Sequence, residues 1–183
     1  MNIENAAHGT TVIAAVCRDG AIIAADMQAT LPNLNKLYQD IKKLVELGTH
    51  SVLGYAGIVT VSEYVRRQKM ALDAWSNFYG KKIAPDGYFC AFANLMFSGG
   101  MDPVFASSAL LLASFDVERA RGRVFQIAYG AALEEESAFG CFAIGSGAER
   151  ALGHLQSLHY SRKMPCEESA AIVRDALVFS HQA

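Results

Sequence analysis

Strand-like and helix-like segments follow one another in this chain in an order that allows few folds. Short apolar runs rich in Val, Ile and Ala predict strands, whereas apolar residues at near-helical spacing predict helices. The predicted order is four strands, two helices, three strands and two helices, at residues 10–17, 21–26, 37–47, 51–57, 59–78, 86–97, 106–116, 122–130, 137–145, 146–160 and 166–180. Helices that come in consecutive pairs after runs of strands do not make βαβ units. We therefore predict mostly antiparallel sheets with helix layers outside them.

The first two predicted strands form a local unit. They are separated by Arg18-Asp19-Gly20, and Asp-Gly supplies the positive backbone dihedral angles of a tight hairpin turn. Residues 10–17 and 21–26 are therefore expected to pair as antiparallel neighbours.

The charge and hydropathy of the chain exclude several classes of partner. The chain has 183 residues, with 16 Lys and Arg against 18 Asp and Glu, so no basic field is available to neutralise nucleic-acid phosphates. Although 52% of the residues are hydrophobic, no uninterrupted apolar segment approaches the roughly 20 residues of a membrane-spanning helix. We expect a soluble protein that binds neither nucleic acid nor membranes.

The cysteines and the N-terminal residues indicate a reducing compartment. Cys17, Cys90, Cys141 and Cys166 are far apart, without a C-x-x-C pair or a histidine at zinc-ligand spacing. We expect reduced, buried thiols and no metal site. The first residues, MNIENAAHG, lack the positively charged stretch and apolar core of a secretory signal. We therefore expect a cytoplasmic protein.

Thr10 follows Gly9 at the start of the first predicted strand. Threonine is common in strands, so this position alone is ordinary. If the Gly9-Thr10 bond were cleaved, however, Thr10 would carry a free α-amine, which titrates at about 8, beside its own hydroxyl. The amine could then act as general base for that hydroxyl, a recognised way to activate threonine. Gly9 would leave room for attack on its carbonyl.

Such a site needs a cation near the amine and a carboxylate to hold that cation. Asp26 ends the strand paired with that of Thr10, and either Lys42 or Lys43 could supply the cation, because neighbouring residues of a strand point to opposite faces. Gly57, at a strand-to-helix junction, could present a backbone N–H to an oxyanion. The alternatives are a turn-capping aspartate, two solvated lysines and a glycine that the turn requires.

Several short motifs in the same order resemble one known family. The run GTTVIAAVCRDGAIIAADMQAT is similar to the opening of proteasome β-subunits and of the bacterial HslV peptidase, which are N-terminal-nucleophile hydrolases. DMQATLPN is closer to the HslV form. The resemblance continues through IKKL, GYAG, AIGSG and HYSRKMPCEES, and so covers nearly the whole chain.

The resemblance implies a role for five residues. Thr10 would be the nucleophile, Asp26 would position the lysine, Gly57 would donate the oxyanion N–H, and Ser146 of GSG would hydrogen-bond near the free amine. The spacing from Thr10 favours Lys42, whereas the lysine pattern and the distance to Gly57 favour Lys43. We select Lys43 as the catalytic lysine.

The resemblance also implies the fold and the reaction. We expect an α+β protein with the four-layer αββα sandwich, a leader at residues 1–9 and a single domain at residues 10–183. The expected activity is that of a threonine endopeptidase that exposes Thr10 by autocleavage, self-associates into rings and requires no cofactor or metal. Its substrates would be polypeptides delivered by an ATP-dependent unfoldase.

The sequence departs from the family pattern, and the first departure below, together with the leader still attached at residues 1–9, motivates an alternative. The family continues past the last helix into further strands, which this chain, ending FSHQA, is expected to lack. Thr60-Val61-Ser62 stands where the family commonly has an Ala-Asp pair. The alternative is a catalytically silent structural subunit; a small-molecule amidase of the same superclass is a third hypothesis.

Overall fold

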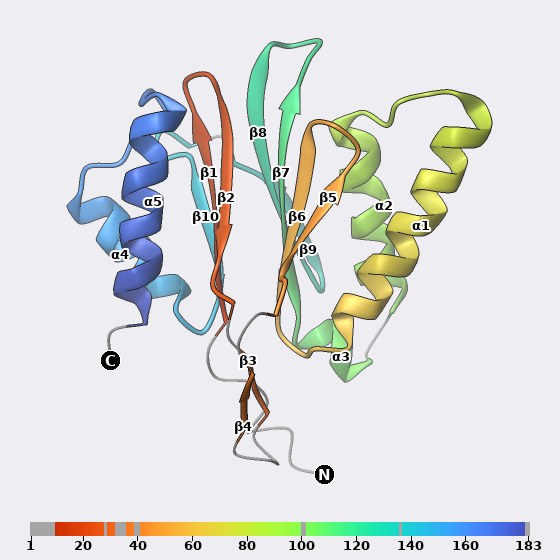
Figure 1. Cartoon of the computed structure of the whole chain (residues 1–183), viewed down its shortest axis with the longest axis horizontal. Coiled ribbons are helices and arrows are strands. Elements are labelled where there is room, and N and C mark those ends of the chain that lie inside the picture. Colours follow the sequence, from red (N-terminus) through yellow and green to blue (C-terminus); the bar gives the residue numbers. More distant parts are fainter. Residues whose placement is uncertain are drawn as a thin grey trace.

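Two antiparallel β-sheets face each other in the computed structural model, with α4 and α5 outside one sheet and α1 and α2 outside the other (Figure 1). The structure describes residues 10–27, 29–31, 36–38, 41–99, 102–135 and 137–181. The expected leader, residues 1–9, lies outside the described residues. The expected α+β class with mostly antiparallel sheets is confirmed.

The smaller sheet has the order β10-β1-β2 and contains β1 (Thr11–Cys17), β2 (Gly20–Ala25) and β10 (Cys141–Gly145). The predicted hairpin is confirmed, because Val12 pairs with Ala25 and Cys17 with Gly20. On the other side of β1, Thr11 pairs with Gly145. Strands that are more than 120 residues apart in the sequence therefore pair in one sheet.

In the larger sheet, neighbouring strands are also consecutive in the sequence. Its members are β5 (Leu44–Leu47), β6 (Ser51–Ala56), β7 (Ala109–Asp116), β8 (Arg121–Ala128) and β9 (Ala131–Glu134). A separate pair consists of β3 (Ala29–Leu31) and β4 (Lys36–Tyr38), which projects from one end of the sandwich (Figure 1).

The helices cover the outer faces of the sheets. They are α1 (Val61–Tyr79), α2 (Pro85–Ser98), the short α3 (Pro103–Ala106), α4 (Ala148–Ser157) and α5 (Cys166–Ser180). Proline at the first position of α2 suits a helix start, since its missing N–H has no partner there. Within the part of the chain that the structure describes, every helix is too short or too polar to cross a bilayer.

Strand β1 is buried throughout because both of its faces are covered. Successive side chains of a strand point to opposite faces. Val12 and Ala14 pack in the core between the two sheets, whereas Ile13 and Ala15 pack against α4 and α5. Fully burying one such Val or Ile side chain stabilises the fold by about 1.5–3 kcal/mol. A third core lies between the larger sheet and α1 and α2.

One predicted strand is wrong. The segment 37–47 was expected to be continuous, but β4 ends at Tyr38, residues 41–43 have no regular secondary structure, and β5 begins at Leu44. The segment has to carry the chain from the β3–β4 pair to the larger sheet, and the Lys42 carbonyl accepts a hydrogen bond from the Tyr55 hydroxyl at 2.8 Å. The two lysines are therefore not on opposite faces of a strand.

Strand β9 was not predicted. Its residues, Ala-Ala-Leu-Glu, have little intrinsic preference for strands. It forms because the chain turns back at Gly130, where φ is +77°, and pairs with β8. The last predicted strand is also shorter than expected, since β10 begins only at Cys141.

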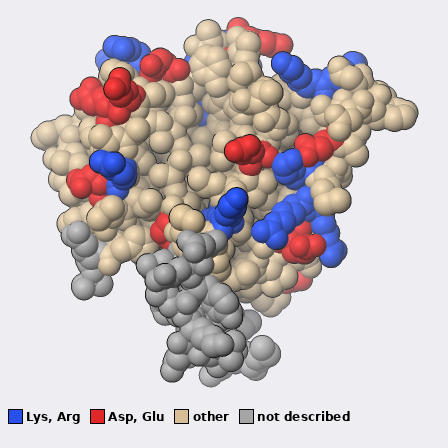
Figure 2. Space-filling view, in the orientation of Figure 1, with Lys and Arg blue, Asp and Glu red and all other residues tan. Residues whose placement is uncertain are grey.

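Charged side chains of both signs are interspersed on the face shown in Figure 2, which fits the nearly balanced charge of the chain. All four cysteines are free. The expectation that they are buried is correct for Cys17 and Cys141 and wrong for Cys90, which is exposed on α2; Cys166 is intermediate.

Candidate functional site

The five residues singled out in the sequence lie at the same end of the two sheets. Thr10 directly precedes β1, Asp26 follows β2 and Ser146 follows β10, and antiparallel pairing brings these three strand ends together. Lys43 precedes β5 and Gly57 follows β6; the Tyr55 N–H donates to the Lys43 carbonyl at 3.2 Å. The topology therefore assembles the candidate site from both sheets.

Thr10 is almost completely buried, with 8% of its surface exposed. Gly145, which pairs with Thr11 across the sheet, has φ +94°, and a Cβ there would lie 2.0 Å from the Thr10 carbonyl oxygen. Only glycine fits this close approach. The backbone of β10 therefore lies directly against Thr10, the residue before β1.

Lys43 and Asp26 form a buried ion pair that joins the two sheets. The distance from Lys43 Nζ to Asp26 Oδ1 is 2.5 Å, and the two side chains are 3% and 8% exposed. Lys42, in contrast, is exposed. Of the two lysines left open by the sequence, Lys43 is the one that reaches Asp26.

The surroundings of Lys43 lower the pKa of its ammonium group. Burial lowers the pKa of Lys43 below its ordinary value, and this effect is larger than the opposing effect of the Asp26 carboxylate. A buried lysine with a lowered pKa is better able to give up its proton than a solvated one. The pair is therefore suited to influence a neighbouring amine.

Gly57 occupies a position that only glycine can take. Its φ is +118°, and a Cβ there would lie 2.4 Å from the Ser107 carbonyl oxygen and 2.5 Å from Ser108 Oγ. The Ser108 hydroxyl is buried and has no hydrogen-bond partner among the described residues. The turn after β6 is thus packed tightly against the start of β7.

Ser146 lies in the exposed turn between β10 and α4. Its neighbour Gly147 packs closely on Thr11, since a Cβ on Gly147 would be 2.3 Å from Thr11 Oγ1. The structure thus brings the GSG turn beside the start of β1. The expected hydrogen bond of Ser146 near a free Thr10 amine stays a prediction.

Three further residues at this end were missed in the sequence. The Thr11 N–H donates to Asp26 Oδ2, the Ser180 hydroxyl lies 3.4 Å from Thr11 Oγ1, and His181 Nε2 lies 3.6 Å from Asp26 Oδ2. Ser180 and His181 belong to the end of α5. The sequence predicts that helix, but nothing in it shows which strand end the helix reaches.

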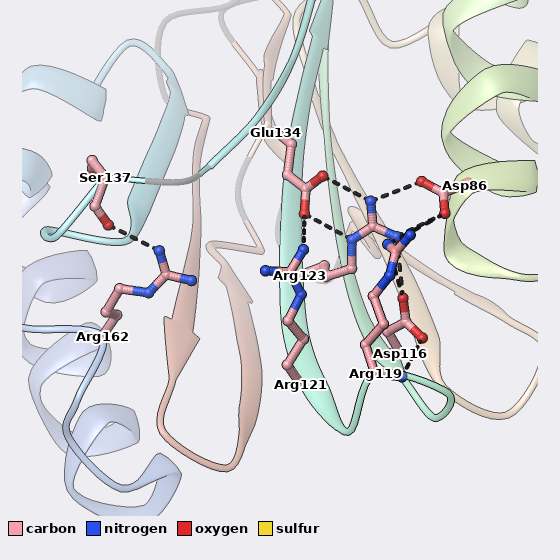
Figure 3. A network of polar contacts seen from close by, with 8 residues as sticks. All are labelled: Asp86, Asp116, Arg119, Arg121, Arg123, Glu134, Ser137 and Arg162. Atoms are coloured by element: carbon pink, nitrogen blue, oxygen red, sulfur yellow. Dashed lines mark hydrogen bonds and ion pairs between the residues drawn. The ribbon is translucent and has the colours of Figure 1, made fainter.

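A second cluster of charges lies at the opposite end of the larger sheet (Figure 3). The buried Arg123 guanidinium donates to the carboxylates of Glu134 at 2.7 Å, Asp86 at 2.7 and 2.9 Å, and Asp116 at 3.2 Å. Hydrogen bonds to Glu134 and Asp86 raise the pKa of Arg123, and those bonds lower the pKa of both carboxyl groups. This cluster ties α2 to β7, β8 and β9.

The described residues at the Thr10 end do not form a metal site. No three His, Cys, Asp or Glu side chains gather as a metal site in the described ranges. A pocket of about 320 Å³ lies elsewhere, beside Ser51 and Ser114.

A mixed α+β fold with two antiparallel sheets and outer helices is consistent with the proteasome fold. Residues 6–182 match the family described as proteasome subunit. The chain belongs to the proteasome subunit family.

Similar proteins include proteasome subunits beta of three bacteria. The chain is 31% identical to that of Parafrankia sp. (strain EAN1pec) over 157 residues, which are 84% of the chain and 56% of the relative. It is 30% identical to that of Gordonia bronchialis over 178 residues (93% and 59%), and 27% identical to that of Streptomyces griseus over 174 residues (94% and 60%). The chain thus spans less than two thirds of the length of these relatives.

Proposed function

We propose that this chain is a threonine-type endopeptidase subunit of a proteasome-like or HslV-like ring, with Thr10 as nucleophile. The observation that carries the proposal is the buried Lys43–Asp26 pair, at the strand ends where Thr10 also lies. Membership of the proteasome subunit family, which contains threonine peptidases, supports the same activity. The fold that we propose is the four-layer αββα sandwich of this hydrolase class.

The reaction begins with cleavage of the Gly9–Thr10 bond, which removes residues 1–9 and leaves the domain at residues 10–183. The freed α-amine takes the proton of the Thr10 hydroxyl as the oxygen attacks a substrate carbonyl carbon. The Gly57 N–H stabilises the oxyanion, and Ser146 hydrogen-bonds near the amine. A protonated Lys43, held by Asp26, disfavours protonation of that amine.

The intermediate then breaks the substrate C–N bond, and the leaving amine takes the proton from the Thr10 α-amine. The acyl group stays on the Thr10 oxygen as an ester. Water attacks this ester, its proton passes to the α-amine and then to the Thr10 oxygen, and the carboxylic acid product is released. The enzyme returns to its starting state without a redox step or a cofactor.

We propose polypeptides as substrates and an ATP-dependent unfoldase as a partner, with self-association into rings in the cytoplasm. The support is family membership and the names of the relatives, which are proteasome subunits beta. The four free cysteines fit a reducing compartment.

Intact-mass measurement of the purified full chain tests the proposal. The wild-type protein and Thr10→Ser are expected to yield a species that begins at residue 10, because serine keeps a nucleophilic hydroxyl, whereas Thr10→Ala is expected to remain full length. A β-lactone, which acylates nucleophilic hydroxyls, should label residue 10 of the wild-type protein only after this cleavage.

A wild-type protein that stays full length and unlabelled would contradict the endopeptidase activity. If such a protein still forms rings in a native mass spectrum, it is the catalytically silent subunit instead.

A further inference from the structure

The end of α5 reaches the carboxylate that holds Lys43. His181 is the residue that caps the C-terminus of α5, and its backbone N–H contacts the carbonyls of Val178 and Phe179. Its side chain, 32% exposed, places Nε2 3.6 Å from Asp26 Oδ2. This contact joins the last described helix to the first hairpin of the chain.

The two oxygens of Asp26 have different partners. Oδ1 faces Lys43 Nζ, whereas Oδ2 accepts the Thr11 N–H and faces His181 Nε2. A carboxylate held on both oxygens cannot rotate freely about its Cβ–Cγ bond. Contacts on the Oδ2 side therefore help to keep Oδ1 directed at Lys43.

The position of the helix end makes this contact electrostatically useful. The C-terminus of a helix carries a partial negative charge, and here the side chain of its capping residue reaches the buried Asp26 carboxylate. Two negative groups side by side destabilise each other. An imidazole N–H, or an imidazolium, on the capping residue is favourable to both, so a donor at residue 181 suits this place.

We propose that His181 is a positioning residue that acts through Asp26 on Lys43 and thereby on the Thr10 amine. The inference rests on the proposed function, because it assigns His181 a part in that same reaction. His181 acts on Thr10 in this proposal only through Asp26 and Lys43 and does not contact Thr10 itself. Its effect should appear in the rate of acylation and not in the binding of the acylating compound.

The experiment compares His181→Ala and His181→Gln with the wild-type full chain. Acylation of Thr10 by a β-lactone is followed at several concentrations, so that the maximal rate and the half-saturating concentration are measured separately. His181→Ala is expected to acylate about tenfold more slowly at saturation, because Asp26 Oδ2 loses the imidazole beside it and the carboxylate is held less firmly, with an unchanged half-saturating concentration. His181→Gln, which keeps an N–H donor, should recover most of the rate.

His154→Ala provides a matched control. His154, on α4, also contacts a carboxylate of α5, with Nε2 2.9 Å from Asp175 Oδ2, and its ring stacks on Phe179. It therefore shares the kind of contact but does not touch Asp26. Its acylation rate is expected to equal that of the wild type.

The outcomes separate the two proposals. A wild-type protein that is not acylated overturns the proposed function, and the role of His181 falls with it. An acylated wild type with an equal rate for His181→Ala overturns the role of His181 alone. Equal slow rates for His181→Ala and His181→Gln, together with lowered melting temperatures, would show a structural contact and would also overturn the positioning role.

Discussion

Each end of the sandwich buries a cation in contact with carboxylates, but the surroundings shift the pKa of the two cations in opposite directions. At the Thr10 end, Lys43 contacts Asp26, and burial outweighs the carboxylate, so the pKa of Lys43 is lowered. At the other end, hydrogen bonds to Glu134 and Asp86 outweigh burial, so the pKa of Arg123 is raised.

The Lys43–Asp26 pair is suited to take part in a reaction, whereas the Arg123 cluster is suited to stabilise the fold. A guanidinium is always charged and binds carboxylates through several fixed N–H groups, so Arg123 fixes the geometry of its cluster and does not itself exchange protons. A buried ammonium with a lowered pKa can respond to a nearby proton transfer. The same type of contact, a buried cation on a carboxylate, therefore has different consequences at the two ends.

The largest expected effect is at the Arg123 end. Arg123→Ala should reduce the free energy of unfolding, measured by urea titration, by about 3–5 kcal/mol, because it removes a buried guanidinium that bonds three carboxylates and leaves the buried Asp116 with the more distant Arg119 guanidinium, at 3.4 Å. Arg121→Ala is the control: that side chain is 44% exposed and contacts Glu134 at 3.4 Å, so its loss should cost no more than about 1 kcal/mol. Equal costs for the two variants would show that burial does not distinguish these arginines.

At the other end, the expected effect is on the reaction. Lys43→Met should lower the acylation rate of Thr10 about 100-fold, which corresponds to about 2.7 kcal/mol of activation free energy, because the amine loses its neighbouring cation. Lys42→Met, at the exposed neighbour, should leave that rate unchanged. A slow Lys42→Met and a fast Lys43→Met would assign the catalytic lysine to the other residue of the pair.

The smallest expected effect is a pH dependence of stability. Arg123 holds the pKa of Glu134 below its ordinary value of 4.5. The folded state therefore binds the proton of this carboxyl group less well than the unfolded chain does. The resulting stability is present above about pH 4.5 and is lost as the pH falls through the lowered pKa.

Urea midpoints at pH 6 and pH 3 measure this loss. The decrease from pH 6 to pH 3 should be smaller in Glu134→Gln than in the wild type, since glutamine does not titrate. Glu118→Gln, an exposed position in the β7–β8 turn, is the control and should lose as much as the wild type. An equally large loss in Glu134→Gln would show that the acid sensitivity arises from groups other than Glu134.

Local patterns in the sequence predicted most elements of the fold. The Asp-Gly turn predicted the β1–β2 hairpin, and the apolar spacing predicted α1 and α5 to within two residues. The hairpin and the two helices are determined by residues close together in the sequence. Strand β9 depends instead on the free edge of β8, and the break before Leu44 depends on Tyr55 and on the path from β4, so neither is visible in a local pattern.

The same distinction applies to the candidate site. Asp26 was predictable because it ends the strand that pairs with the strand of Thr10. The alternation rule for strands could not choose between Lys42 and Lys43, because the segment is not a strand; the family pattern favoured Lys43, and the structure shows that this residue reaches Asp26. His181 was not predictable, because its place depends on how α5 packs on the smaller sheet.

The ion pair between Lys43 and Asp26 also determines when the site comes into existence during folding. Asp26 directly follows β2 of the smaller sheet, which needs β10 from residues 141–145, whereas Lys43 directly precedes β5 of the larger sheet. Contacts between distant parts of a chain are slow to form. A nascent chain that has made only its first hairpin lacks the surroundings of Thr10, and these are complete only once the two sheets have packed against each other.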